Sequence, residues 1–174
     1  MEQLRSTQPS GATCPGVGPV ATFRRVEVVA ADGGHGVRAL EPIDSGEPIL
    51  HIHGEPVARP SKYSLQVDTD LHIEHPWVEG AVQEPARDQW RYLNHSCEPN
   101  AALVGLTLVA LRPIGEGEEI TFDYNTTEFE MSTPFMCQCG HCGGALIRGF
   151  KFLDPAQKRR LQPRLAEHLR RTLV

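Results

Sequence analysis

The sequence predicts a mostly β domain with several small sheets, followed by a C-terminal helix. Short β-branched or alternating runs succeed one another from Arg24 onward, and turn residues such as DGG, DSGE and GEGEE separate them. After the last cysteines the pattern changes to leucines at every fourth position, which is the spacing of a helix. The length of 174 residues fits one domain, and 40% hydrophobic with 22% charged residues is the composition of a folded protein.

The elements follow one another from an N-terminal arm to a short internal helix. Residues 1–22 are rich in Pro, Gly, Ser and Thr and have no sustained apolar period, so we expect a flexible arm there. A short helix is expected within residues 82–93, where Trp90 and Leu93 share a face with Ala86. The runs expected to form strands are RVEVVA, GVRAL, PILHIHG, YSLQV, LHIE, ALVGLTLVALR and EEITFDY.

The C-terminal helix is expected over residues 154–174, with Asp154 as its cap and Pro155 in the first helical position. Pro163 should kink this helix or split it into two pieces. We expect the apolar stripe to pack on the sheet and the basic face to be solvated, with an anion or nucleic-acid contact as the alternative. The stripe consists of Leu161, Leu165, Leu169 and Leu173, and the basic face of Lys158, Arg159, Arg160, Arg164, Arg170 and Arg171.

The overall charge limits the classes of partner. A formal net charge of -5 and a pI near 5.9 give no overall attraction to nucleic acid or to an anionic membrane, and they mildly favour basic partners. The apolar runs are far shorter than the roughly 20 residues of a membrane helix, and no stretch resembles a secretory signal. We therefore expect a cytoplasmic or nuclear protein that is neither secreted nor membrane-bound, and nucleic acid is not an expected partner.

The cysteines indicate a metal site. Their number is odd, and four of the five stand in contexts that suit a metal better than disulfides. The CxCxxC motif at 137–142 offers three thiolates, whereas structural zinc takes four tetrahedral ligands. Cys97 is the favoured fourth ligand and His141 is the alternative; reduced buried thiols without a metal are the remaining interpretation. The expected ligands are thus Cys97, Cys137, Cys139 and Cys142, and Cys14 is left over.

Two polar segments concentrate groups with functional potential. In GGHGVRA, residues 33–39, the glycines around His35 lie between two strand-like runs and predict a tight turn with exposed backbone groups. In RYLNHSCEPNA, residues 91–101, an amide, an imidazole, a hydroxyl and a thiol fall within four residues. Asn94 is a candidate to bind a neighbouring backbone group or a ligand. His95, taken alone, is better explained by a satisfied buried histidine than by a catalytic base.

A third segment, GEEITFDYN at 117–125, has the alternation of a strand. Tyr124 marks the end of this strand, where a tyrosine considered alone is usually a core or rim residue. Only the neighbouring motifs favour a functional role for it. The alternation places Ile120 and Phe122 on one face of the strand, and Thr121 and Asp123 on the other.

These segments and the cysteine cluster, in this order, resemble the SET domain family from about Arg24 to Leu153. The resemblance implies a SET-type β-clip fold of several small sheets with a C-terminal pseudoknot. It also implies a SET domain over residues 23–131 and a post-SET zinc-binding segment over 132–153. The sequence departs from the family pattern in three ways. The usual CxCx4C spacing is shortened to CxCxxC, no cysteine-rich segment precedes the SET region, and the stretch between Tyr63 and Arg91 is short.

The resemblance implies an S-adenosylmethionine-dependent N-methyltransferase that methylates an amine by in-line displacement, with one structural Zn²⁺ ion. The favoured acceptor is a lysine presented by a protein substrate, and we expect a monomer. A non-catalytic SET-fold zinc-binding interaction protein, or an enzyme acting on a small molecule, are the alternatives.

The resemblance also assigns the site residues, which should converge on one cavity with entrances on opposite sides. Tyr124 matches the catalytic tyrosine, and we expect it to act as an orienting hydroxyl rather than as a base. Tyr92 and Phe122 are assigned to the substrate channel; because position 122 is not a tyrosine, we expect di- or trimethylation. The residues assigned to cofactor binding are Gly34, His35, Gly36, Tyr63, Arg91, Asn94, His95 and Phe135.

Overall fold

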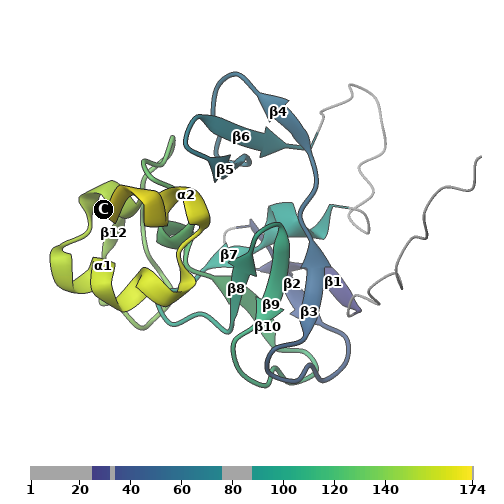
Figure 1. Cartoon of the computed structure of the whole chain (residues 1–174). Helices are drawn as coiled ribbons and strands as arrows, with labels where there is room; N and C mark the ends of the chain where they lie inside the picture. Colours follow the sequence, from purple (N-terminus) through teal and green to yellow (C-terminus); the bar gives the residue numbers. More distant parts are fainter. Residues whose placement is uncertain (1–24, 32–33, 76–87, 174) are drawn as a thin grey trace, which may run out of the picture.

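The computed structural model describes residues 25–31, 34–75 and 88–173 (Figure 1). The expected flexible arm at 1–22, which includes Cys14, and the Ala86 part of the helix expected within 82–93 lie outside the described residues. Three small sheets and a two-stranded hairpin make up the β structure of the described part. The prediction of a mostly β fold with several small sheets is confirmed.

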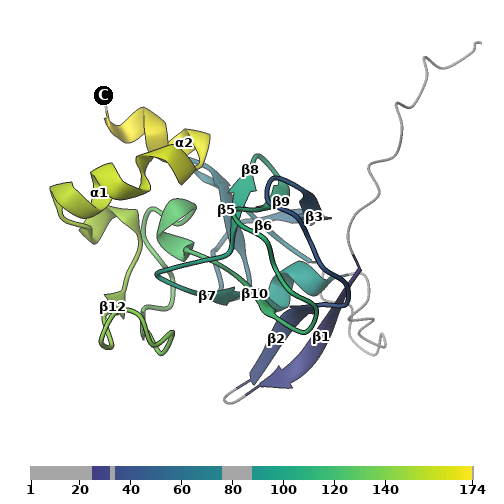
Figure 2. The ribbon, with the colours of Figure 1, turned by 90° about the horizontal axis from the view of Figure 1, so that it is seen from below.

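The first sheet brings together the motifs on which the functional assignment depends. Its strand order is β1-β2-β10-β7, and β7 runs parallel to β10. In this pairing Asn94 lies opposite Thr121, and His95 lies opposite Phe122, so the two polar motifs are neighbours (Figure 2). The bounds are β1 (Val26–Ala31), β2 (Gly34–Ala39), β7 (Asn94–His95) and β10 (Glu119–Phe122).

The turn expected around His35 is replaced in the structure by a strand. Strand β2 begins at Gly34, and His35 and Gly36 pair with Ala30 and Val29 of β1 in an antiparallel register. The prediction that these glycines form a tight turn is therefore wrong. Glycine is needed here for a different reason, which is the close approach of another chain segment to Gly36, described below.

Two further sheets complete the β structure, and a large apolar core includes residues of both. In Figure 1 the β4-β6-β5 sheet lies above the β3-β9-β8 sheet. The fully buried residues Ile49 and Leu108 come from the β3-β9-β8 sheet, and Ile43, Ile114 and Ile120 join them in the core. The bounds are β3 (Pro48–His51), β9 (Thr107–Ala110) and β8 (Ala101–Val104), then β4 (Glu55–Val57), β6 (Leu71–Glu74) and β5 (Leu65–Asp68).

The helix expected within 82–93 is, in its described part, the short 3₁₀ helix η1 (Gln89–Tyr92). Trp90 and Leu93 are both buried, as their shared face predicted. The helix stops at Leu93, whose backbone is extended, because the next residues enter strand β7.

Strand β10 leads into a second 3₁₀ turn, η2 (Tyr124–Thr126). Ile120 and Phe122 are buried as predicted, but Asp123, which was expected on the opposite face, is also only 3% exposed. Its side chain caps η2, since Oδ1 accepts hydrogen bonds from the backbone and side-chain amides of Asn125 at 3.0 and 2.9 Å. The cap accounts for the buried carboxylate at this position.

The C-terminal segment is helical and is divided at Pro163, as predicted. Its elements are η3 (Phe150–Phe152), α1 (Pro155–Leu161), η4 (Gln162–Arg164), α2 (Glu167–Arg170) and η5 (Arg171–Leu173). Asp154 and Gln157 form a capping box at the start of α1. None of the helices in the described ranges is long and apolar enough to cross a membrane.

Three of the four leucines in the predicted stripe are buried, in a small cluster around Phe150. The fourth, Leu173, is 41% exposed. The four-residue spacing keeps leucines on one face only while the helix is regular, and here the segment changes to 3₁₀ geometry on both sides of α2. The stripe therefore ends at Leu169 in the folded protein.

The divided C-terminal helix holds the segment that follows Tyr124. The backbone amide of Ala166 donates to the Thr126 carbonyl at 2.8 Å. The buried His168 places Nε2 2.8 Å from the Thr127 carbonyl. These two contacts hold η2 and the residue after it against α2. The stripe packs with Phe150, Phe129 and Leu153 in a cluster of its own, and not on the sheet as expected.

Candidate active site and metal centre

A cavity of about 1220 Å³ collects most of the residues assigned to the site by sequence. Those on its lining are Tyr63, Arg91, Asn94, His95, Phe122, Tyr124 and Phe135. These side chains come from β7, β10, β11 (Phe135–Met136), the 3₁₀ helices η1 and η2, and the segment before β5, which are far apart in sequence. The convergence of Asn94 and Tyr124 on one cavity agrees with the expectation; the two opposite entrances stay a prediction.

Four assigned residues do not line this cavity: Gly34, His35, Gly36 and Tyr92. Tyr92 contacts His35 edge-on, with ring centroids 5.4 Å apart, and packs against the main core. The structure therefore places Tyr92 beside β2 and not in a channel next to Tyr124. From β2, Arg38 lines the cavity directly, whereas His35 is joined to it through the side chain of Asn94.

Asn94 joins β2 to the cavity through its amide. Its Nδ2 donates one hydrogen bond to the His35 carbonyl at 2.9 Å and another to Glu119 Oε1 at 2.8 Å. Both amide hydrogens are thus used, which orients the side chain and leaves Oδ1 for a donor from another group. Gly36 lies directly beneath this pair, because a Cβ added there would come within 2.6 Å of Glu119 Oε1 and 3.2 Å of Asn94 Nδ2.

Substituting Gly36→Ala should weaken cofactor binding by displacing Asn94. The added methyl group has no room, so Glu119 and Asn94 must move, and we expect the dissociation constant for S-adenosylhomocysteine to rise about tenfold. Gly115→Ala is the matched control, since a Cβ there meets only Glu118 Oε2 at 3.9 Å and Gly115 does not line the cavity. Calorimetric titration of both variants checks the prediction, and equal affinities would contradict it.

Tyr124 is held rigidly at the centre of an aromatic group. Its hydroxyl donates to the Leu93 carbonyl at 2.6 Å, and its backbone amide donates to His95 Nδ1 at 3.2 Å. Its ring packs against Phe122, His95 and Phe135 at centroid distances of 4.9, 5.3 and 5.9 Å. Burial raises the pKa of Tyr124 above its usual range, with nearby carboxylates adding to the effect, so the phenol stays neutral.

His95 connects Tyr124 to the cysteine cluster. Burial lowers the pKa of His95 to about 4, so its ring is neutral near pH 7. Since Nδ1 accepts from the Tyr124 amide, the ring proton belongs on Nε2, which lies 3.2 Å from Cys97 Sγ. The histidine therefore acts as a buried hydrogen-bond anchor, the role that sequence reasoning favoured.

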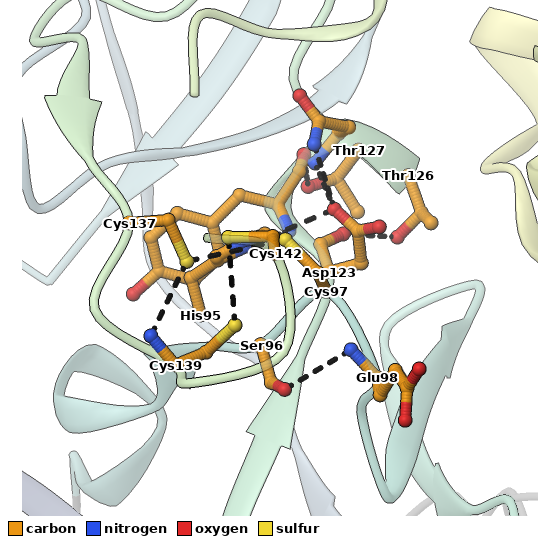
Figure 3. Close-up of polar contacts among 12 residues, drawn as sticks. His95, Ser96, Cys97, Glu98, Asp123, Thr126, Thr127, Cys137, Cys139 and Cys142 are labelled. Carbon is orange, nitrogen blue, oxygen red and sulfur yellow. Dashed lines mark hydrogen bonds and ion pairs between the residues drawn. The ribbon is translucent and has the colours of Figure 1, made fainter. Parts of the chain in front are cut away.

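The four cysteines assigned to the metal come together from two segments of the chain (Figure 3). Their sulfur atoms all lie within 4.8 Å of one another, with Cys97 and Cys137 at 3.9 Å and Cys139 and Cys142 at 3.9 Å. Zn–S bonds of about 2.3 Å in a tetrahedron require sulfur separations of roughly 3.8 Å. These four residues therefore fit a structural zinc ion.

The structure distinguishes between the two candidates for the fourth ligand. Cys97 belongs to the cluster, whereas His141 directs Nδ1 toward Glu98 Oε2 at 3.7 Å. The shortened spacing between Cys139 and Cys142 is accommodated by Gly140, whose φ of 81° reverses the chain within two residues. A left-handed glycine thus compensates for the two residues that the motif lacks.

The cysteine cluster also positions Phe135. Strand β11 (Phe135–Met136) pairs with β12 (Leu146–Ile147), and Cys137 continues this pairing by donating its amide to the Ala145 carbonyl at 2.9 Å. The hairpin directs Phe135 into the cavity, where its ring lies 5.7 Å from that of His95. A metal at the cluster would therefore stabilise one wall of the cavity.

Sequence reasoning missed three contributors to the site: Glu119, Glu128 and the carbonyl of Leu93. Glu119 was detectable, because it is on the same face of the β10 strand pattern as Thr121. Glu128 lies four residues after Tyr124. This spacing brings two residues together only where the backbone makes a helical turn, which the sequence did not predict here. The Leu93 carbonyl carries no sequence signal at all.

Comparison with known proteins gives a family and several relatives. The SET domain family matches residues 34–125. Histone-lysine N-methyltransferase ash1 of Drosophila melanogaster is 34% identical over 134 residues, which cover 68% of this chain and 6% of that protein. A histone-lysine N-methyltransferase of Candida albicans, described as H3 lysine-36 specific, is 31% identical over 68% of this chain and 16% of its own length. The chain thus spans only a small part of the length of these relatives.

Solved structures support the fold. A crystal structure of KRYPTONITE in complex with mCHG DNA and SAH superimposes with a TM-score of 0.51 and 25% sequence identity. The similarity covers 69% of this chain and 28% of that one. The SET-type arrangement of small sheets that the resemblance implied is therefore confirmed.

Proposed function

Because the chain belongs to the SET domain family, we propose that it transfers a methyl group from S-adenosylmethionine to the side-chain amine of a protein lysine. The observation that carries this proposal is the convergence of Asn94, Tyr124 and Phe135 on one cavity beside a four-cysteine site. The cofactor and the acceptor would then be held by the same few rigid elements, as in-line transfer requires, and the metal site would stabilise one of these elements.

The cavity lining supports a cofactor site of this kind. Arg91 and Tyr63 stand together at the cavity, with the guanidinium carbon 5.5 Å from the ring centroid, and Tyr63 is 46% exposed. Asn94 Oδ1 is left to accept a hydrogen bond, and Phe135 offers an aromatic face. S-adenosylmethionine, when bound, would supply the methyl group on a positive sulfonium centre.

The contribution of the protein to the reaction is mainly geometric. Holding the amine and the methyl carbon in line can lower the barrier by roughly 7–11 kcal/mol through effective molarity. A lysine, with an ordinary pKa of about 10.4, must lose its proton first, and desolvation in the cavity favours that loss. Tyr124, neutral and anchored on the Leu93 carbonyl, orients the amine and does not act as its base.

Relatives and charge support a basic protein substrate. Several relatives carry the name histone-lysine N-methyltransferase; some of them are described as H3 lysine-36 specific and another as H3 lysine-4 specific. The net charge of -5 favours a basic partner electrostatically. We therefore propose histone H3 as the first substrate to test, in a nuclear setting.

The test is incubation of the chain with labelled S-adenosylmethionine and either histone octamers or a whole lysate. We expect label on a lysine, and mass spectrometry should find two or three methyl groups, because Phe122 leaves the channel without the hydroxyl of a tyrosine. Calorimetric titration with S-adenosylhomocysteine accompanies the assay. Cofactor binding without transfer to any protein would favour the non-catalytic alternative, and the absence of both would overturn the proposal.

A further inference from the structure

A buried carboxylate lies in the cavity wall and has no part in the chemistry described so far. Glu128 is 8% exposed and lines the cavity together with Tyr124. Its backbone amide donates to the Tyr124 carbonyl at 2.9 Å, which places it one helical turn after the tyrosine. The carboxylate is close enough to the phenol to contribute to the raised pKa of Tyr124.

One oxygen of Glu128 is fixed by the adjoining sheet. Its Oε1 accepts the backbone amide of Gln66 in β5 at 2.8 Å. Gln66 is itself held, because its Oε1 accepts the Phe129 amide at 2.8 Å and its Nε2 donates to the Asp68 and Thr69 carbonyls. This network sets the direction of the carboxylate without using its second oxygen.

The second oxygen, Oε2, accepts no hydrogen bond from the described residues, and its ion-pair partner there is a histidine. The nearest cationic candidate for Oε2 is His72 Nε2 of β6 at 3.6 Å, which is too long for a hydrogen bond. Tyr124 on η2 is a further titratable neighbour, because the Glu128 carboxylate contributes to the raised pKa of its phenol. Burying a carboxylate costs free energy unless a cation or a hydrogen-bond donor pairs with it. The position next to Glu128 Oε2 in the cavity wall therefore suits a cationic ligand.

We propose that Glu128 binds the ammonium group of the incoming lysine, an inference that rests on the proposed function. The channel would then attract its substrate in the protonated form, through a charge-assisted hydrogen bond to Oε2. A carboxylate favours the charged form of the amine, whereas transfer needs the neutral form. Glu128 is therefore a binding residue that lowers KM and does not raise kcat.

The first test measures binding of n-butylamine, an ammonium ion at neutral pH, against 1-butanol, its neutral analogue. Both are titrated by NMR into the chain, with and without S-adenosylhomocysteine. We expect the wild type to bind the ammonium about tenfold more tightly than the alcohol. Glu128→Gln should abolish this preference, because the amide keeps the shape and loses the charge.

Glu130→Gln is the matched control. It removes the same charge two residues away, where the side chain is exposed and paired with Lys151 at 2.6 Å. The control should keep the ammonium preference of the wild type. A preference that survives in Glu128→Gln, or that falls equally in both variants, would overturn the assignment.

A kinetic measurement separates binding from folding. On a substrate identified by labelling, Glu128→Gln should raise KM about tenfold and leave kcat unchanged or higher. If this variant does not fold, titration of the wild type still tests the proposal, because equal affinities for butylammonium and butanol would contradict it. A wild type that prefers butylammonium but transfers no methyl group would count against the proposed function and not against this inference.

Discussion

Replacing Tyr124 with phenylalanine should lower kcat by about 10²- to 10³-fold and leave the affinity for S-adenosylhomocysteine nearly unchanged. The reason lies in the position of the hydroxyl, which donates to the Leu93 carbonyl and is directed by packing of the ring against Phe122, His95 and Phe135. Without it the amine loses an orienting group in a water-poor site. Steady-state transfer assays and calorimetric titration measure the two quantities.

Loss of this hydroxyl also removes one buried hydrogen bond, at a cost of about 1 kcal/mol in the free energy of unfolding. That cost is too small to unfold a typical domain, so the fall in kcat can be separated from denaturation by thermal melting. Tyr92→Phe is a useful comparison, because Tyr92 lies off the cavity against His35. Similar losses in both variants would contradict a specific role for Tyr124.

Removing the metal should abolish transfer. We expect about one zinc ion per chain, bound by Cys97, Cys137, Cys139 and Cys142. Chelation, or Cys139→Ser, leaves the remaining thiolates without their shared cation, so the hairpin that carries Phe135 should lose its position. Structural metals contribute several kcal/mol, and the melting temperature should fall by about 10 °C or more. Elemental analysis, melting curves and transfer assays measure these effects.

Cys14→Ser is the control for the metal prediction, since it makes the same substitution at a cysteine that is not one of the four expected ligands. This variant should keep its zinc and its transfer activity. Stoichiometric zinc in Cys139→Ser, or full activity after complete chelation, would show that the cluster has another role.

Several features of the protein were determined by the sequence itself. Alternating runs predicted the strands because a β-strand directs successive side chains to opposite faces, and this is why Ile120 and Phe122 are buried. Pro163 predicted the division of the C-terminal helix because it has no amide hydrogen to donate. The spacing of the cysteines identified a metal site, since few other arrangements explain three thiols within six residues.

Other features were decided only by the tertiary structure. Cys97 and His141 were both reasonable as the fourth ligand, and the fold brings only the cysteine into the cluster. Asn94 bonds to the His35 carbonyl across 59 residues of sequence, and Gly36 of β2 provides the space for this contact and not a turn. Sequence patterns report local conformation, whereas these contacts depend on how distant segments pack.

The carboxylate of Glu128 illustrates the same limit. Its proposed role depends on the backbone hydrogen bond to Tyr124, on the hydrogen bond from Gln66 and on its position in the cavity lining. None of these is a property of residue 128 or of its neighbours in sequence. The sequence determined which chemical groups the chain possesses. The packing of β5, β7, β10 and the C-terminal helices determined which of these groups come into contact. The reason is that burial and hydrogen bonding act between surfaces that exist only in the folded state.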